Sequence, residues 1–146
     1  MEVVVIKKFK AFFNFLLLLL LGVFLTSCGS KGVVMSPIVF VEGEEIGIVG
    51  YVANETDKEH NDLPSVYKEV EHQKVNPNAK VKLDYEDEPK KVVLKQWRDG
   101  VYSTEKALAE NSFNAPNEEG IYTYNIATRW NYKTASNTVF VLAVEE

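Results

Sequence analysis

The run Gly120-Ile121-Tyr122-Thr123-Tyr124-Asn125-Ile126-Ala127-Thr128-Arg129-Trp130 decides the fold. Tyr122, Tyr124 and Ile126 alternate with smaller or polar side chains, which is the period-2 pattern of a half-buried β-strand. A polar turn follows at residues 131–137, and residues 138–144 (TVFVLAV) then return as a second strand-like run. We expect these two strands to pair antiparallel.

Upstream segments carry weaker strand signals of the same kind. Residues 38–41 and 46–49 predict a pair of short strands, and residues 81–85 and 91–97 predict a hairpin around the acidic turn at 86–89. Residues 101–111 favour helix in part, but they are too few to support one alone and are interpreted as a connecting strand and loop. Many short strands without a long helix indicate an all-β fold, an antiparallel sandwich or barrel.

Residues 54–78 differ from the rest because they are polar and contain Pro64 and Pro77. A loop of this length is unusual in a compact domain, and it is either functional or partly ordered by a short helix such as 64–72. We expect this loop to be a candidate contact for a partner.

A local motif narrows the fold. The stretch Glu118-Glu119-Gly120-Ile121-Tyr122-Thr123-Tyr124 resembles the acidic-x-Gly-x-Tyr-x-Cys pattern of immunoglobulin-type domains, with Tyr124 at the position of the second disulfide cysteine. The resemblance implies a sandwich of about seven strands with a tyrosine corner at Tyr122. It also implies that Trp97 is the core Trp of an earlier strand. The chain has one cysteine, so no intramolecular disulfide can form. Tyr122, Tyr124 and Trp130 are interpreted as packing residues rather than ligand-stacking ones.

The C-terminal half also resembles small uncharacterised extracytoplasmic modules of Bacillus-type Firmicutes. The residues that carry this resemblance are 92–97 (VVLKQW), 114–122 (NAPNEEGIY), Trp130 and a Phe-containing last strand, and it covers residues 80–144 best. The resemblance implies a similar fold and an extracytoplasmic location, but these modules have no established activity that could be transferred to this chain.

The N-terminus has the three parts of a secretory signal. Lys7, Lys8 and Lys10 precede an apolar run over 11–25, and small residues follow it. The run is shorter than the roughly 20 apolar residues that a membrane-crossing helix needs. It ends in Leu25-Thr26-Ser27-Cys28, which resembles the lipobox of bacterial lipoproteins.

That resemblance implies cleavage between Ser27 and Cys28 and transfer of diacylglycerol to the thiol of Cys28. Leu25, Thr26 and Ser27 would then be the residues that the signal peptidase recognises. We therefore expect three segments: a removed signal at 1–27, a lipidated tether at 28–35 and a β-sandwich domain at 36–146. An ordinary cleaved signal with an incidental cysteine is the alternative. The expected location is the extracytoplasmic face of the cell membrane, reached through two acyl chains.

Charge limits the possible partners. The whole chain has 16 basic and 21 acidic side chains, and removal of residues 1–27 leaves 13 and 20. A net charge of −7 disfavours nucleic acid or anionic lipid as a partner, because phosphate contacts depend on clustered Lys and Arg.

Candidate chemistry is sparse. His60 and His72 are the only histidines, and with Asp57 and Asp62 they offer imidazole and carboxylate groups for a divalent metal. Their spacing does not bring them together, so solvated side chains are favoured. Glu86, Asp87 and Glu88 lack the spacing of a calcium loop. We therefore expect no catalytic residues, no metal and no cofactor.

Two classes of function remain. The favoured one is a lipid-tethered, non-catalytic binding module that contacts an envelope protein or small ligand through the 54–78 loop or an exposed sheet edge. The alternative is a protease inhibitor that inserts a loop into an active site. A metal-dependent envelope enzyme is the third and least favoured.

Overall fold

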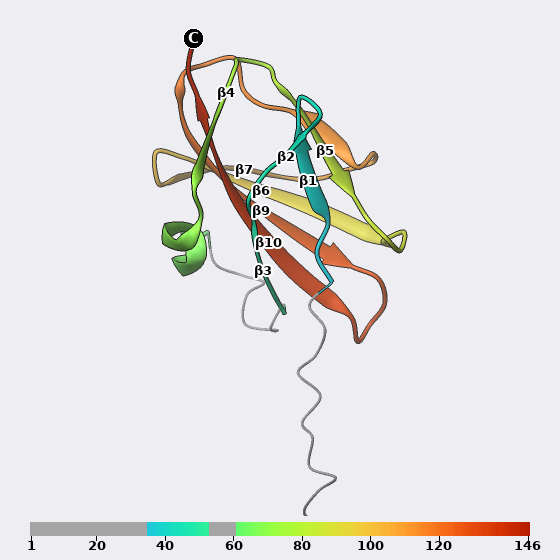
Figure 1. Cartoon of the computed structure of the whole chain (residues 1–146). Helices are drawn as coiled ribbons and strands as arrows, with labels where there is room; N and C mark the ends of the chain where they lie inside the picture. Colours follow the sequence, from blue (N-terminus) through green and yellow to red (C-terminus); the bar gives the residue numbers. More distant parts are fainter. Residues whose placement is uncertain (1–34, 53–60) are drawn as a thin grey trace, which may run out of the picture. The chain divides into compact units, whose positions relative to one another are not determined.

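The computed structural model describes residues 35–52 and 61–146, and the folded unit extends over Val34–Glu146 (Figure 1). Its elements, in chain order, are β1 (Ile38–Val41), β2 (Glu44–Glu45), β3 (Val49–Val52), the 3-10 helix η2 (Ser65–Glu69), β4 (His72–Val75), β5 (Lys80–Asp84), β6 (Lys91–Arg98), β7 (Val101–Ala107), β8 (Ser112–Asn114), β9 (Gly120–Arg129) and β10 (Ala135–Val144).

The strands form two sheets, which confirms the expected all-β, two-sheet class. Sheet A has the order β2-β1-β5-β8, and sheet B has the order β3-β10-β9-β6-β7 with β4 also paired to β10. All of these pairings are antiparallel except that of β4 with β10. The long strand β10 thus has β9 along one side and divides its other side between β3 and β4.

The central hairpin is the one that the alternating run predicts. β9 and β10 pair over ten residues, from Gly120 opposite Val144 to Arg129 opposite Ala135. This register places Tyr122, Tyr124 and Ile126 on one face, opposite Leu142, Phe140 and Thr138. The prediction of an antiparallel pair at 120–130 and 138–144 is confirmed.

The core lies between the two sheets. Val39, Val81 and Leu83 of sheet A pack in one buried cluster with Leu94, Tyr124 and Phe140 of sheet B. Alternation along the strands produces this layer because successive side chains point to opposite faces of a sheet.

Two local predictions are wrong. The segments at 81–85 and 91–97 do not form a hairpin, since β5 lies in sheet A between β1 and β8 while β6 lies in sheet B between β9 and β7. The first short strand is confirmed as β1, but the second one, expected at 46–49, is misplaced because β3 begins only at Val49. A strand pattern shows that a segment is extended, but it does not show which neighbour receives its backbone hydrogen bonds.

The number of strands also differs from the expected value of about seven. The described part of the chain contains ten, of which β2 has two residues and β8 has three. Strands this short carry no recognisable period-2 pattern, so they could not be counted from the sequence.

The segment expected as a long loop at 54–78 is largely built into the fold from residue 61 onward. It contains η2, within the range where a short helix was considered, and then β4, which runs parallel to residues 141–144 of β10. Val70 and Val75 are buried, and they hold this segment against the sheet. Residues 53–60 lie outside the described part.

Candidate interaction site

The lipobox residues Leu25, Thr26, Ser27 and Cys28 lie outside the described residues, as do Asp57 and His60. Lipidation of Cys28 therefore stays a prediction from the sequence. Within the described ranges, no helix is long and apolar enough to cross a membrane.

Tyr122 forms a local corner at the start of β9. Its hydroxyl donates a hydrogen bond of 3.0 Å to the carbonyl of Glu118, four residues upstream, as a tyrosine corner requires. The guanidinium carbon of Arg98 lies 5.8 Å from the ring centroid, and Arg98 is ion-paired with Glu118. Burial of the ring raises the pKa of the Tyr122 hydroxyl.

Gly120 is needed in this corner. Its φ of +153° is a backbone conformation that side chains disfavour, and a Cβ at this position would lie 3.3 Å from Nε of Arg98. The corner therefore joins the β6–β7 turn to the loop before β9. The polar groups of the corner, on Tyr122, Arg98, Glu118 and Asp99, form hydrogen bonds and ion pairs within the corner, which indicates a structural role.

Tyr124 lies in the centre of the core. It is fully buried and stacks on Phe140 at 5.1 Å and against Phe113 at 5.2 Å between ring centroids. Its hydroxyl has no hydrogen-bond partner among the residues that the structure describes. Burial raises the pKa of Tyr124 far above that of a tyrosine in water. Tyr124 is thus an aromatic packing residue, as the sequence pattern predicts.

We predict a loss of stability at alkaline pH that Tyr124→Phe weakens. An unfolded tyrosine ionises near pH 10, whereas buried Tyr124 stays protonated above that value. The folded state then binds more protons than the unfolded state, so stability is complete below pH 10 and falls above it, by up to about 1.4 kcal/mol per pH unit for each such tyrosine.

Removal of the unpaired hydroxyl in Tyr124→Phe raises the unfolding free energy at pH 7 by about 1 kcal/mol. It also moves the alkaline unfolding midpoint to higher pH. Urea titrations from pH 7 to 11 measure both effects, and Tyr132→Phe, at an exposed site, serves as the control. A lower stability of Tyr124→Phe at pH 7 would contradict the prediction.

Trp130 directly follows β9, at the end of the strand opposite to the Tyr122 corner. Its indole N–H donates 2.8 Å to the carbonyl of Asp87, and its ring meets Tyr85 edge-on at 6.0 Å. The hydroxyls of Tyr85 and Thr128 lie 2.9 Å apart, and burial raises the pKa of Tyr85 to about 12. The cluster fastens the acidic 86–88 turn to sheet B.

Trp97 is buried, with 1 % of its surface exposed, but on a different face from the one expected. It lies opposite Thr123 in β9, and Thr123 points away from the face of Tyr122 and Tyr124. Its indole N–H donates 2.8 Å to the carbonyl of Asn61, and its ring meets Tyr102 edge-on at 6.0 Å. Trp97 thus packs on the outer face of sheet B, outside the layer between the sheets.

The segment that meets this outer face is residues 61–75, which we call the 61–75 strip. It begins at the Trp97 contact, continues through η2, where Val66 and Tyr67 pack against the core cluster, and ends as β4. Most of its polar side chains are exposed: Ser65, Lys68, Glu69, Glu71, His72, Gln73 and Lys74. The strip is held by its buried side chains Val70 and Val75 and by the pairing of β4 with β10, and its polar side chains are open to a partner.

The proposed metal ligands do not meet in this strip. Asp62 and His72 are both exposed, and no group of three His, Cys, Asp or Glu side chains within 35–52 and 61–146 is placed to hold a metal ion. The exposed Glu86–Glu88 turn belongs to no such group either. Asp57 and His60 remain outside this statement.

A polar row on the outer face of sheet B was not anticipated. Lys95 and Asn125 lie opposite each other in β6 and β9. Only 12 % of the Lys95 side chain is exposed, and its ammonium group forms an ion pair of 3.4 Å with Glu105 on β7. Oδ1 of Asn125 is buried without a partner in the described part of the chain. Polar residues at outward positions of an alternating strand are normally exposed to solvent. The sequence pattern therefore does not predict that Lys95 and Asn125 are shielded from it.

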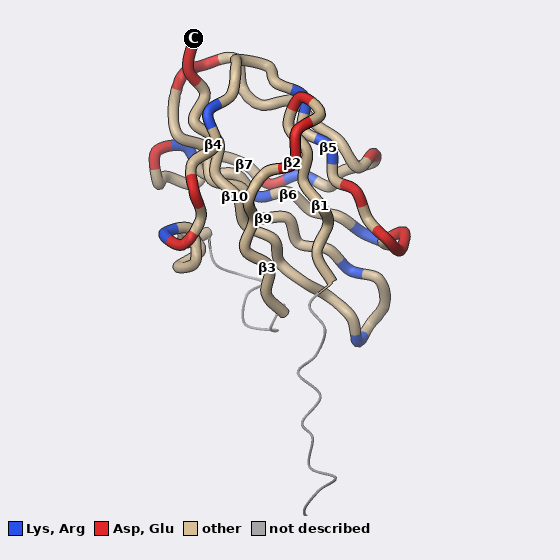
Figure 2. The backbone as a smooth tube through the Cα atoms, viewed as in Figure 1, with Lys and Arg blue, Asp and Glu red and all other residues tan. Residues whose placement is uncertain are grey.

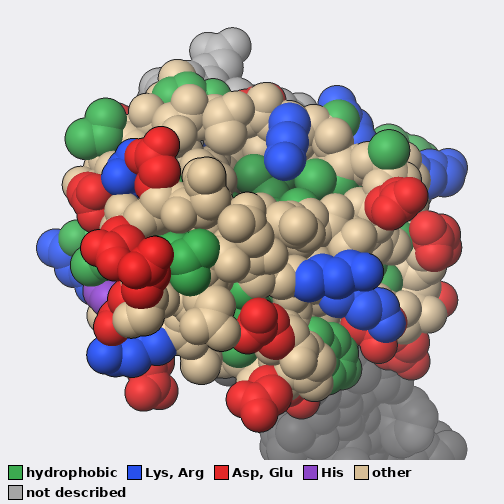
Figure 3. All heavy atoms as spheres, turned by 90° about the horizontal axis from the view of Figure 1, so that it is seen from above, with side chains coloured by type: hydrophobic (Ala, Val, Ile, Leu, Met, Phe, Trp, Pro, Cys, Tyr) green, Lys and Arg blue, Asp and Glu red, His purple; other side chains and the backbone are tan. Residues whose placement is uncertain are grey.

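One sheet edge is long and open. β7 ends sheet B, and its pattern VYSTEKA is exposed at every position except Tyr102. Figure 3 shows the face at the end of the C-terminus, where acidic and basic side chains are interspersed and hydrophobic ones are scattered.

No family model, no curated protein and no solved structure matches this chain.

Proposed function

We propose that this chain is an exported lipoprotein that is held on the extracytoplasmic face of the cell membrane by a diacylglyceryl group on Cys28. Leu25-Thr26-Ser27-Cys28 after a basic and then apolar segment supports the proposal, as does the use of a single cysteine. The folded unit beginning at Val34 leaves room for a short tether after Cys28.

The domain is of immunoglobulin-like architecture in this proposal. The order β1-β5-β8 corresponds to strands A, B and E of that fold, and β10-β9-β6-β7 corresponds to G, F, C and C′. The tyrosine corner at the start of β9 supports the match, since strand F carries it in the family. Trp97 departs from the pattern because it packs on the outer face of β6.

Its function is non-catalytic binding of an envelope protein or small ligand through the 61–75 strip. The observation that carries this proposal is that the backbone of the strip is held in place while its polar side chains are exposed. Val70, Val75 and the Trp97–Asn61 hydrogen bond hold the backbone in place, while charged side chains from Lys68 to Lys74 face solvent. A preorganised polar surface loses little entropy when a partner binds.

We predict that the double reversal Lys68→Glu/Glu71→Lys abolishes capture of the partner. It leaves net charge unchanged and alters two exposed positions, so the fold should persist. The measurement is crosslinking of the lipidated full chain in its host, followed by quantitative mass spectrometry of the captured proteins.

The matched control is Lys82→Glu/Asp84→Lys on β5, another exposed, charge-neutral swap. Partners lost in the strip variant and kept in the control support the strip. If capture is insensitive to the strip variant but lost in Lys106→Glu, the binding site is the β7 edge. Inhibition of secreted proteases by the purified protein would favour the inhibitor class.

A further inference from the structure

The described chain enters the domain at one end of sheet B. The carbonyl of Met35 accepts a hydrogen bond of 2.5 Å from the Ser136 hydroxyl. Ser136 is the second residue of β10, next to the loop that joins β9 to β10 and contains residues 131–134. Figure 1 shows the described chain beginning at the end of the molecule where this loop lies, with the C-terminus at the opposite end. The end that contains Met35 is called the near end below.

The length of chain before Met35 restricts how the domain meets a bilayer. Six residues separate Cys28 from Met35, so the tether spans at most about 25 Å when fully extended. The ten residues of β9 alone span about 30 Å. The tether is therefore too short to run back alongside the domain and present the far end to the membrane.

The 131–134 loop has the side chains of a headgroup contact. Tyr132 is 81 % exposed, the largest value among the exposed large hydrophobic residues, and the Lys133 ammonium lies 5.2 Å from its ring centroid. Tyrosine and lysine both place an apolar stem in the interfacial region of a bilayer with a polar tip in water.

The loop is held in shape rather than loosely exposed. Oδ1 of Asn131 accepts hydrogen bonds from the backbone N–H groups of Lys133 at 2.8 Å and Thr134 at 2.9 Å. The N–H of Trp130 donates 3.0 Å to the carbonyl of Thr134. This closed turn keeps the exposed tyrosine at the tip of the hairpin.

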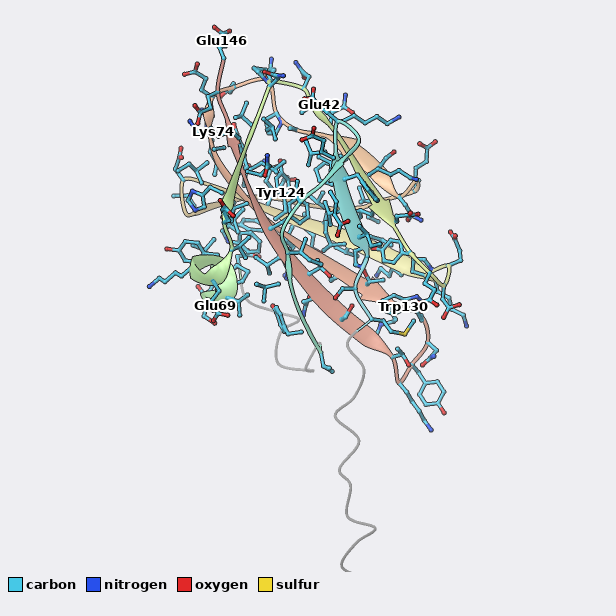
Figure 4. All side chains as sticks on the ribbon, viewed as in Figure 1. Glu42, Glu69, Lys74, Tyr124, Trp130 and Glu146 are labelled. Carbon is cyan, nitrogen blue, oxygen red and sulfur yellow. The ribbon has the colours of Figure 1, made fainter. Side chains whose placement is uncertain are left out.

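Charge favours the same orientation. Glu42 and Glu146 lie at the far end in Figure 4, opposite Trp130, together with Lys74, and Figure 2 shows acidic residues at the far end as well as elsewhere on the domain. The near end has Lys133 at its tip and Lys91 opposite Arg129 in the sheet, together with the acidic 86–88 turn that Trp130 holds. An anionic membrane surface repels the far end and attracts the lysine at the tip.

We infer that the β9–β10 loop is a membrane-docking tip, with Tyr132 and Lys133 seated in the headgroup layer of the bilayer that holds the lipid on Cys28. The inference rests on the proposed lipid anchor. It assigns a second, weaker membrane contact to the protein and gives the domain a defined orientation on the membrane.

The test uses the lipidated full chain in phosphatidylglycerol vesicles that contain nitroxide-labelled lipid. One variant carries a thiol-linked bimane at Lys133→Cys, and the other carries it at Val101→Cys, which is 70 % exposed and follows the Asp99–Gly100 turn at the far end. We expect several-fold stronger quenching at position 133 than at position 101. Adding Tyr132→Ser to the first variant should remove most of the difference.

Flotation of the vesicles separates this proposal from the anchor itself. If the protein floats and both positions are quenched equally, the docking tip is overturned and the anchor stands. If the protein does not float, the anchor is overturned and the docking tip with it.

Discussion

Replacement of Trp97 by alanine is expected to lower the free energy of unfolding by about 3–5 kcal/mol, the range for removing a buried Trp. The side chain is almost fully buried on the outer face of sheet B, and it makes both the hydrogen bond to Asn61 and the edge contact with Tyr102. Its loss leaves the outer face of β6 uncovered and removes the contact at which the 61–75 strip begins. Urea unfolding followed by circular dichroism measures the effect.

Two further variants distinguish attachment of the strip from a general loss of packing. Trp97→Phe keeps an aromatic ring but not the N–H donor, so we expect a smaller loss of about 1–2 kcal/mol. Trp130→Ala is a matched control, because Trp130 is also buried and also donates 2.8 Å to a backbone carbonyl, at Asp87.

Amide hydrogen exchange then provides the specific readout. We expect Trp97→Ala to accelerate exchange in residues 61–75, while Trp130→Ala leaves that segment protected and accelerates exchange around residues 86–88. A Trp97→Ala protein with unchanged protection at 61–75 would show that the strip is held by Val70 and Val75 alone.

The second large effect is expected at Cys28. If the proposed anchor is correct, Cys28→Ser removes the thiol that would form the thioether to diacylglycerol. The two acyl chains, whose buried CH2 groups would each contribute about 0.8 kcal/mol to membrane binding, are then lost with it. We expect the variant to leave the membrane fraction and to lack the mass of the lipid. Cell fractionation and intact-mass measurement test this.

Ser27→Ala is the appropriate control, since it keeps a small residue before the cysteine and should be lipidated as the native protein is. If Cys28→Ser remained in the membrane fraction, the segment at 11–25 would have to be retained as an anchor instead. The docking tip alone is too small to hold the protein, because it offers one tyrosine and one lysine.

Some features of the fold are encoded locally and could be predicted. The β9–β10 hairpin follows from alternation within one continuous stretch, and the corner at Tyr122 joins two residues that are four apart in the chain. The β6–β7 turn is also local: Asp99 and Gly100 have φ values of +49° and +82°, which Asp-Gly pairs adopt readily in two-residue hairpins. The Asp99-Gly100 pair is therefore a local signal for this hairpin that is present in the sequence.

By itself, the sequence determined the all-β class, the last hairpin, the tyrosine corner and the expectation of a lipid on Cys28, because each depends on side chains that are near one another in the chain. Only the tertiary structure decided that β5 and β6 separate into two sheets, that Trp97 packs on the outer face and that residues 61–75 form an ordered strip. These depend on which distant segment supplies a hydrogen-bond partner or a covering side chain, as Asn61 does for Trp97 and β10 does for β4. A period-2 pattern describes one strand and contains no information about that choice.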